Sequence, residues 1–302
     1  MRLRFFAVVI AACLILALAH NSWADGCSVC SGILRSTSPL EEGGIENLFE
    51  QQQADASPFN AELRLGGLYD SRVGAESGDG NGDDDTALAA ALTAGWQAPL
   101  KGDAGLRLDY KGYMDLHRDF HEYNMIDQTL SLEPQYKAGS FIYSLPLSFN
   151  LMMENGEHKY NRYSVSPTAT FLIPQTRQAV AVYGIVARID DRDKDEDLDE
   201  DAMAFGGGFA YLYAFENKSH VRLSLGYQHT AYDKVRVWDY PTTSGSLDKR
   251  ADDAIVAGLD ILFQITDHFG LYINYSFTHS DSNVSLYEYN RHLAGAGISL
   301  KF

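Results

Sequence analysis

The chain has 302 residues, a formal net charge of −17 at pH 7, and 45% hydrophobic residues. The apolar content excludes a disordered chain, and the negative charge excludes general nucleic-acid binding, because phosphate contacts need a basic surface. Tyr 18, Phe 15 and Gly 26 favour a strand-rich protein over a helical bundle.

Residues 1–24 have the organisation of a secretory signal peptide. Arg2 and Arg4 supply the charged start, an apolar stretch follows, and SWA at 22–24 places small residues correctly for cleavage. The apolar stretch is shorter than the roughly 20 residues of a membrane-spanning helix, with a retained anchor as the alternative. No later segment is long and apolar enough for such a helix. We therefore expect an exported protein that is either soluble or a membrane β-barrel.

Residues 25–58 are polar and turn-rich, and we interpret them as a periplasmic segment or linker. Cys27 and Cys30 have the C-x-x-C spacing that permits a small disulfide in an oxidising compartment. Lipid attachment at Cys27 and redox or metal chemistry are the alternatives. Two cysteines cannot complete a zinc site, and the absence of a histidine after Cys30 excludes c-type haem. We expect no cofactor.

From residue 59 to 302 the sequence alternates with a period of two, which is typical of strands with two different faces. In segment 104–117 the charged residues Arg107, Asp109 and Lys111 alternate with apolar and aromatic residues. The same alternation predicts twelve strands, near 61–69, 87–98, 104–117, 127–137, 140–153, 159–173, 178–190, 202–214, 219–232, 252–265, 269–281 and 290–302. Between Val180 and Val186 the phase is ambiguous.

The connections between these strands alternate in length. The short connections are PLKGD, KAGS, PQTRQ, FENKS and TDH. The other connections are longer and polar, and they include NGEHK and DDRDKDEDLDED. Outer-membrane barrels alternate short periplasmic turns with longer extracellular loops in this way. The predicted fold is therefore all-β, a transmembrane antiparallel up-and-down barrel of about 12 strands over residues 59–302, with both termini periplasmic. A soluble antiparallel domain is the alternative.

Aromatic residues fall at the strand ends beside the short turns, where an interfacial girdle is expected. They are Trp96, Tyr136, Phe141, Phe171, Tyr213, Phe269 and Phe302. The chain ends with Ile298, Leu300 and Phe302 on alternate positions. This ending resembles the C-terminal signature of Gram-negative outer-membrane proteins, which the barrel-assembly machinery reads. The resemblance implies that machinery, outer-membrane lipid and lipopolysaccharide as partners.

Three stretches resemble a narrower family. YDSRV, LSLEPQYKAGSFIYSLPLSF and DSNVSLYEYNRHLAGAGISLKF are similar to parts of the C-terminal barrels of surface lipoprotein assembly modifier proteins, over residues 60–302. Those barrels follow a helical repeat domain, which residues 25–58 cannot hold. The resemblance implies a barrel and a translocation role, but not the client recognition of the repeat domain.

The face opposite the apolar row carries charges that we expect to line the lumen. These residues are Glu62, Arg64, Arg107, Asp109, Lys111, Glu133, Arg162, Arg188, Arg222 and Asp260. They predict either an aqueous path or a plug of paired side chains, because a 12-stranded barrel lies between filled and open sizes. The inward Gly206, Gly208, Ala210, Gly295 and Gly297 are expected to leave local room. The inward Arg and Lys side chains favour an anionic solute.

One of two acidic loops is a weak candidate for cation binding. DDRDKDEDLDED at 190–201 is either a solvated loop or a site where Asp195, Asp197 and Asp199 bind divalent cations, including cations that bridge to lipopolysaccharide. DGNGD in the first long loop begins like a calcium-binding EF-hand loop. Asp84 and Ala90 occupy the positions that need Gly and Glu, so no calcium site is predicted there.

We expect no enzymatic activity. His229 is predicted to face lipid without a serine beside it on the neighbouring strands, and His279 and Ser280 lie on opposite faces. The G-x-S-x-G and H-E-x-x-H motifs do not occur. The sequence therefore predicts a porin-like channel or export conduit for a small solute or exported molecule. The alternative is a structural or adhesive barrel with a filled lumen and acidic loops that bind partners or cations.

Overall fold

The computed structural model describes residues 58–73, 83–99, 103–192, 201–233, 249–284 and 287–302. The predictions for the signal peptide, for residues 25–57, for Cys27 and Cys30, and for Asp195, Asp197 and Asp199 lie outside these residues. Within the described ranges, no helix is long and apolar enough to cross a membrane.

The described chain is almost entirely β-structure. Its strands are β1 (Phe59–Asp70), β2 (Asp85–Pro99), β3 (Ala104–His117), β4 (Met125–Ala138), β5 (Phe141–Ser144), β6 (Leu147–Glu154), β7 (Glu157–Val165), β8 (Thr168–Ile173), β9 (Gln178–Asp191), β10 (Ala202–Ala214), β11 (His220–Tyr232), β12 (Ala251–Gln264), β13 (Phe269–Ser282) and β14 (Tyr289–Lys301). One turn of 3₁₀ helix, η2 (His121–Tyr123), lies between β3 and β4.

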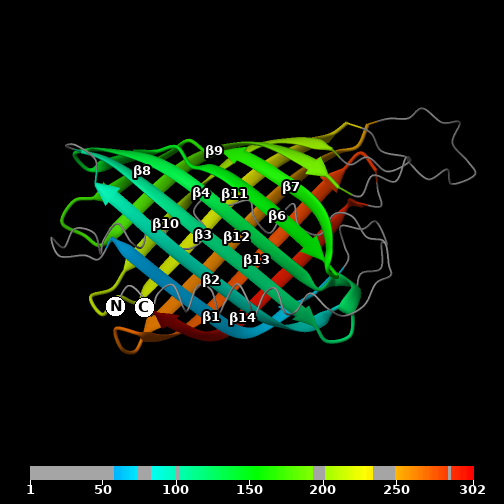
Figure 1. Ribbon diagram of the computed structural model, residues 1–302, viewed down its shortest axis with the longest axis horizontal. Helices are drawn as coiled ribbons and strands as arrows, with labels where there is room; N and C mark the ends of the chain where they lie inside the picture. Colours follow the sequence, from blue (N-terminus) through cyan, green and yellow to red (C-terminus); the bar gives the residue numbers. More distant parts are fainter. Residues whose placement is uncertain (1–57, 74–82, 100–102, 193–200, 234–248, 285–286) are drawn as a thin grey trace, which may run out of the picture.

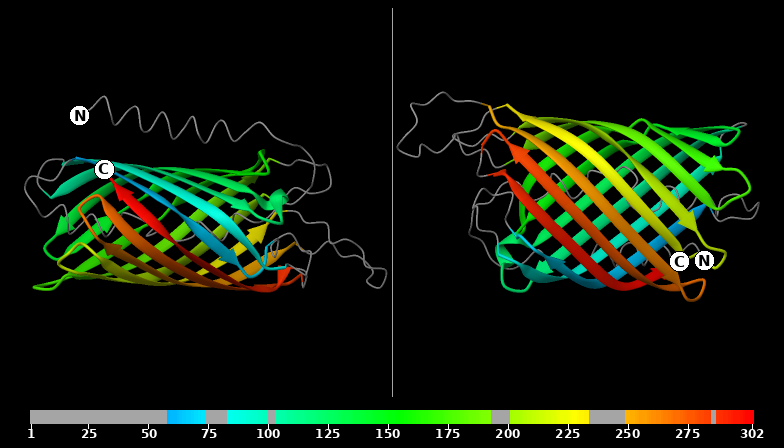
Figure 2. Two further views of the ribbon diagram at one scale, coloured as in Figure 1. Left: turned by 90° about the horizontal axis from the view of Figure 1, so that it is seen from below. Right: turned by 180° about the vertical axis from the view of Figure 1, so that it is seen from behind.

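The strands close into one antiparallel barrel (Figures 1 and 2). β14 pairs with β1, and β9 pairs with β10, so the sheet returns on itself. β5 and β6 both pair with β4, and β7 and β8 both pair with β9, so each of these pairs occupies one place in the wall. The prediction of a closed 12-stranded antiparallel barrel is confirmed.

The two faces of the wall have opposite chemistry. On β1, Leu65 and Tyr69 are 40% and 41% exposed on the outside, whereas Arg64 and Asp70 on the alternate positions are 4% and 0% exposed. An apolar outside and a charged inside are stable only when hydrocarbon surrounds the barrel. Because the strands form a single closed layer, the alternative of a soluble two-sheet domain is excluded.

The two ends of the barrel differ, and we name them by their connections. The short-turn end carries the connections between β2 and β3, β4 and β5, β8 and β9, β10 and β11, and β12 and β13. The long-loop end carries the connections between β1 and β2, β3 and β4, β6 and β7, β9 and β10, β11 and β12, and β13 and β14. At the short-turn end, Lys218 Nζ lies 3.0 Å from Asp267 Oδ1, and this hydrogen bond and charge hold the pKa of Asp267 below its usual value.

Exposed aromatic side chains surround the outer wall near both ends. Trp96, Tyr136, Phe141, Tyr213 and Phe302 are exposed at the short-turn end, as predicted. Toward the long-loop end, the exposed outward aromatics Tyr69, Phe205 and Tyr227 form a second set that the sequence analysis missed. Two aromatic girdles that flank an apolar band are typical of membrane barrels.

One predicted long connection is a tight turn. Glu154 pairs directly with Glu157, which leaves only Asn155 and Gly156 between β6 and β7. Both residues have positive φ, 49° and 81°, and Asn-Gly is the preferred sequence for a two-residue hairpin turn of this kind. The prediction of a longer loop at NGEHK was wrong, because its last three residues continue the strand.

The C-terminal strand closes the barrel. Ile298 lies opposite Leu65 on the lipid face, and Phe302 N donates a 2.9 Å hydrogen bond to Ala61 O. The apolar ending of the chain is therefore paired along its length and leaves no free strand edge.

Replacing Leu65 with Lys is expected to lower the free energy of unfolding by about 2–4 kcal/mol, because the charge would enter the lipid face at mid-strand. Urea unfolding in lipid vesicles measures the loss. Thr93→Lys, on the inward face of the neighbouring β2, is the control and is expected to cost much less. An equal loss in both variants would contradict the assignment of the two faces.

Candidate functional site

Nine of the ten charged residues predicted for the lumen face inward. They are Glu62, Arg64, Arg107, Asp109, Lys111, Glu133, Arg162, Arg222 and Asp260. They come from six strands on different sides of the barrel, and closure brings some of them together. Arg64 and Asp260 are 196 residues apart in the sequence, yet their side chains are hydrogen-bonded.

Arg188 is the exception, and its predicted inward placement was wrong. Its side chain is 39% exposed on the outer face, while Ala187 and Ile189 on either side face inward and are almost fully buried. Arg188 donates to Asp201 Oδ2 at 2.8 Å and to Asp233 Oδ2 at 2.7 Å. Both faces of β9 are apolar, with alanines inside and valines outside, so alternation could not fix its phase.

A buried ion network joins β1, β12 and β14. Arg64 Nε donates to Glu62 Oε1 at 2.7 Å, and Arg64 Nη1 donates to Asp260 Oδ2 at 3.2 Å. Ser299 Oγ donates to the same Glu62 oxygen at 2.7 Å. On β3, Arg107 Nε donates to Asp109 Oδ1 at 2.9 Å. Arg64 therefore links β1 to β12 across the inner face of the two strands, β13 and β14, that separate them in the wall.

A second set of buried pairs lies toward the long-loop end. Arg291 Nε donates to Asp70 Oδ1 at 2.9 Å, and Arg250 Nε donates to Asp252 Oδ2 at 2.9 Å. The Arg250 guanidinium also lies 4.3 Å from the centre of the Tyr232 ring. The predicted lumen residues do not include these four. Asp70 lies on the same face of β1 as Arg64, so the alternation of the sequence could have identified it.

Buried carboxylates surround the interior near this end. They are Asp70, Asp85, Asp115, Glu154, Asp191 and Asp252. Arg291 and Arg250 supply positive charge beside them, and the His117 ring lies 3.4 Å from Asp85 and 3.8 Å from Asp115. Within the described ranges, no group of three or more His, Cys, Asp or Glu could hold a metal ion.

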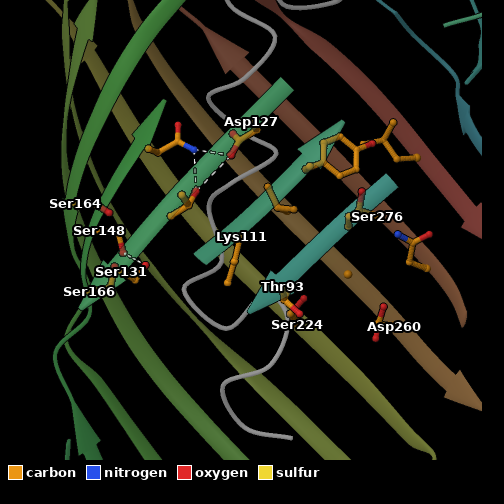
Figure 3. Close-up of a pocket in the computed structure, with 18 of the residues that line it drawn as sticks. Thr93, Lys111, Asp127, Ser131, Ser148, Ser164, Ser166, Ser224, Asp260 and Ser276 are labelled. Atoms are coloured by element: carbon orange, nitrogen blue, oxygen red, sulfur yellow. Dashed lines mark hydrogen bonds between the residues drawn. The ribbon is translucent and has the colours of Figure 1, made fainter. Parts of the chain in front are cut away.

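The middle of the lumen contains a cavity of about 300 Å³, which we call the central chamber (Figure 3). Hydroxyl side chains dominate its polar wall: Thr93, Thr129, Ser131, Ser148, Ser164, Ser166, Ser224, Ser276 and Thr278. Four acidic and four basic residues also line it, namely Asp109, Asp127, Glu133, Asp260, Lys111, Arg162, Arg222 and Arg291. Apart from the predicted charges, the sequence analysis missed this wall, although its serines lie on inward positions of the predicted strands.

The chamber offers hydrogen-bonding groups of both kinds. Asn150 Nδ2 donates to Asp127 Oδ1 at 2.6 Å and to Thr129 Oγ1 at 2.9 Å, which fixes that amide. The other amide atom, Asn150 Oδ1, is buried without a hydrogen-bond partner, and so is Asn274 Oδ1 in the wall of the same chamber. An unpaired buried acceptor is costly, but both oxygens have almost no accessible surface, so the hydroxyl side chains are the groups that a polar guest would meet.

The inward glycines do not leave the open space that we expected. A Cβ at Gly208 would meet the Tyr183 hydroxyl and a backbone carbonyl, and one at Gly226 would also meet the Tyr183 hydroxyl. A Cβ at Gly295 would meet the Asn274 side chain. The space beside these glycines is therefore occupied by larger side chains, such as Tyr183 and Asn274.

Two outward histidines have acceptor partners. His229 Nδ1 lies 3.0 Å from Asp253 Oδ1, and His279 Nδ1 lies 2.8 Å from Asn290 Oδ1. Ser280 is buried on the inner face, so it points away from His279 as predicted. These contacts orient each imidazole, but neither partner is a hydroxyl nucleophile.

The comparisons with known proteins show similarity in fold only. No family model matches the chain, and neither does any curated protein. The chain is similar in structure to an outer membrane channel of the COG4313 group from Pseudomonas putida F1, with 12% identity, a TM-score of 0.49, and coverage of 82% of this chain and 97% of that one.

Two further solved structures are similar. An anion-selective porin from Comamonas acidovorans has 9% identity, a TM-score of 0.42, and coverage of 81% of this chain and 98% of that one. The outer membrane phospholipase A from Escherichia coli has 13% identity, a TM-score of 0.41, and coverage of 79% and 89%. The likeness concerns the outer-membrane β-barrel fold. The narrower resemblance to surface lipoprotein assembly modifier proteins stays a prediction.

Replacing Asp70 with Ala is expected to lower the free energy of unfolding by about 3–5 kcal/mol, because Arg291 would lose its buried carboxylate partner. Urea unfolding in lipid vesicles measures this loss. The double variant Asp70→Leu/Arg291→Met removes both charges and is expected to recover most of it. A double variant as unstable as Asp70→Ala would contradict the pairing argument.

Replacing Gly208 with Ala is expected to cost about 1–3 kcal/mol, because the new methyl group would overlap Tyr183 and the backbone of β11. The Gly67→Ala change on the outer face of β1 meets open space and is the control. Thermal unfolding on semi-native gels compares the two variants. Similar transition temperatures for both variants would show that Tyr183 does not occupy this space.

Proposed function

We propose that the protein is an outer-membrane channel or export conduit for a small polar molecule, and that the central chamber lies on its path. The observation that carries the proposal is the chamber itself. It lies at mid-barrel, and it is lined by small hydroxyl side chains together with the amides of Asn150 and Asn274. A barrel that served only as a scaffold would be expected to fill this volume with packed side chains.

The charges around the chamber favour an uncharged polar or zwitterionic guest. Acidic and basic residues line it in equal number, and part of that charge is already neutralised by pairs such as Arg107 with Asp109. The anionic solute expected from the sequence has less support, because that prediction considered the basic residues without the carboxylates paired with them. Ser131 and Ser148, whose hydroxyls lie 2.8 Å apart, add uncharged hydrogen-bonding groups.

The proposed orientation places the short-turn end and the barrel's two terminal strand ends in the periplasm. The difference in connection length between the two ends supports it, since periplasmic turns are the shorter ones in outer-membrane barrels. The C-terminal Phe302 supports assembly by the barrel-assembly machinery. Outer-membrane lipid, lipopolysaccharide and divalent cations at the acidic loops complete the proposed partners.

We do not propose an enzymatic role. The oriented imidazoles of His229 and His279 face acceptors instead of hydroxyl nucleophiles. A lipid-hydrolysis assay on the purified protein tests the expected absence of enzymatic activity, and clear activity would overturn that expectation.

A structural or adhesive barrel is the second candidate, and the buried ion pairs favour it. Arg64 with Asp260 connects β1 to β12, and Arg291 with Asp70 connects β14 to β1. Buried charges without their partners would be strongly destabilising, so these pairs resist opening. Solute passage through proteoliposomes distinguishes the two candidates.

Replacing Ser166 with Trp is expected to slow the swelling of proteoliposomes in a small sugar or amino acid several-fold, because the indole would enter the chamber. Val165→Trp, one residue earlier on the lipid face, is the control and is expected to leave the rate unchanged. Equal rates for the native protein and the Ser166 variant would contradict a path through the chamber. Absence of swelling with the native protein would favour the structural candidate.

Replacing Lys111 with Gln is expected to shift the channel toward cations, because it removes one of the four positive charges that line the chamber. The reversal potential in a planar bilayer with a salt gradient measures the shift. Asp127→Asn is the matched opposite change and is expected to shift selectivity toward anions. An unchanged reversal potential in both variants would show that ions do not pass these residues.

A further inference from the structure

Three prolines lie in adjacent parts of the barrel wall. Pro134 is on β4, Pro146 lies between β5 and β6, and Pro167 lies between β7 and β8. Proline cannot donate a backbone hydrogen bond, so within sheets it is normally confined to edge strands, strand starts and bulges. In this closed barrel the three prolines instead fall within consecutive ladders.

Each proline removes one of the two hydrogen bonds of a strand pair. Leu145 N donates to Pro134 O at 3.1 Å, Ser166 N donates to Pro146 O at 3.0 Å, and Gly184 N donates to Pro167 O at 3.0 Å. In a regular antiparallel pair the second residue would return a bond from its own N–H, and proline has none. We call this line, from Pro134 through Leu145 and Pro146 to Pro167 and Gly184, the proline seam.

The inner side of the proline seam is the wall of the central chamber. Pro146 and Ser166 both line the chamber, with Ser148 and Ser164 beside them. Thr168 Oγ1 donates a 3.1 Å hydrogen bond to Ser166 O, the carbonyl to which Pro146 cannot donate. A polar group inside the chamber is therefore separated from the outside by one layer of backbone with small side chains.

The outer side of the proline seam faces lipid. Leu145 is 40% exposed there, and the exposed Pro167 lies beside it in the wall. Gly184 pairs with Gly207 on β10, so two neighbouring outward positions next to Pro167 lack side chains. Weak backbone pairing, the central chamber on the inside and two glycine positions on the outside thus meet at one place.

We propose that the proline seam is a lateral passage, through which a single-chain amphiphile moves between the central chamber and the membrane. Its polar head would lie among the serines of the chamber, and its apolar chain would pass between Leu145 and Pro167 into lipid. The chamber, about 300 Å³, is at the lower end of the roughly 300–1,000 Å³ of small-molecule sites, which suits one chain or head group and not a whole diacyl lipid.

This inference rests on the proposed function, because the amphiphile enters by the same chamber as a small solute. It also gives a reason for the prolines. In hydrocarbon an unpaired backbone group is costly, so the loss of ladder bonds at three neighbouring positions, one of them replaced by Thr168 Oγ1, indicates the part of the wall that separates most easily.

The test uses proteoliposomes with lipopolysaccharide in the outer leaflet and albumin trapped inside. A dansylated medium-chain fatty acid is added outside, and its arrival at albumin is followed by fluorescence. The triple variant Pro134→Val/Pro146→Ser/Pro167→Val returns the three N–H donors. Pro174→Ser, in the turn between β8 and β9, is the matched control outside the seam. We expect transfer to fall several-fold in the triple variant alone.

A reversible disulfide across the proline seam tests the same inference within a single variant protein. Leu145 and Pro167 lie between the paired residues Ser144 with Thr168 and Leu147 with Val165, so Leu145→Cys/Pro167→Cys bridges the seam. Oxidation is expected to slow fatty-acid transfer several-fold, and reduction is expected to restore it, which excludes misfolding as the cause. Phe149→Cys/Tyr163→Cys is the control pair away from the prolines.

Sugar-driven swelling of the same vesicles separates this inference from the proposed function. Slower fatty-acid transfer with unchanged swelling supports the lateral passage. Transfer that is equal in native, triple-variant and oxidised protein, or no faster than in empty vesicles, overturns it. If the native protein shows seam-dependent transfer without swelling, the lateral passage holds and the small-solute channel fails.

Discussion

In hydrocarbon every backbone N–H and C=O must find its partner within the protein, and the closed barrel is how this chain meets that requirement. Pairing of β14 with β1 completes the ladder, so the strands at the two ends of the barrel sequence lie side by side. Once the wall is closed, each alternate side chain has one environment: lipid or lumen. The outer leucines and aromatics and the inner charges are both consequences of this closure, and so is the existence of an interior in which a chamber can form.

The interior is organised by the cost of buried charge. Arg64 and Arg291 are nearly inaccessible, and each is matched by a carboxylate on another strand, Asp260 and Asp70. Such pairs need excellent geometry to balance desolvation, and here the rigid wall supplies it. Between the layers of pairs, serines, threonines and glycines take up little volume, and the chamber lies at this level. Charge pairing and side-chain size together therefore decide where the lumen is filled and where it is open.

Alternation in the sequence predicted the twelve-stranded wall because most strands carry clearly different faces, as Arg107 and Asp109 show on β3. It failed at Arg188, where both faces of β9 are apolar and only contacts with neighbouring strands define the phase. It also overestimated the loop at Asn155 and Gly156, since the turn chemistry of these two residues outweighs the polarity of those that follow. Pairing partners such as Arg64 and Asp260 were beyond its reach, because they depend on how far the strands are staggered around the barrel.

The contacts across the closure between β14 and β1 bear on how the protein is made. Arg291 reaches Asp70 near one end of this interface, and Ser299 reaches Glu62 near the other. A slip of two residues would keep every side chain on its proper face, so hydrophobicity alone would tolerate the error. It would, however, separate Arg291 from Asp70 and Ser299 from Glu62 within the buried interior. The polar contacts between β1 and β14 therefore favour the correct register when these two strands pair to close the barrel.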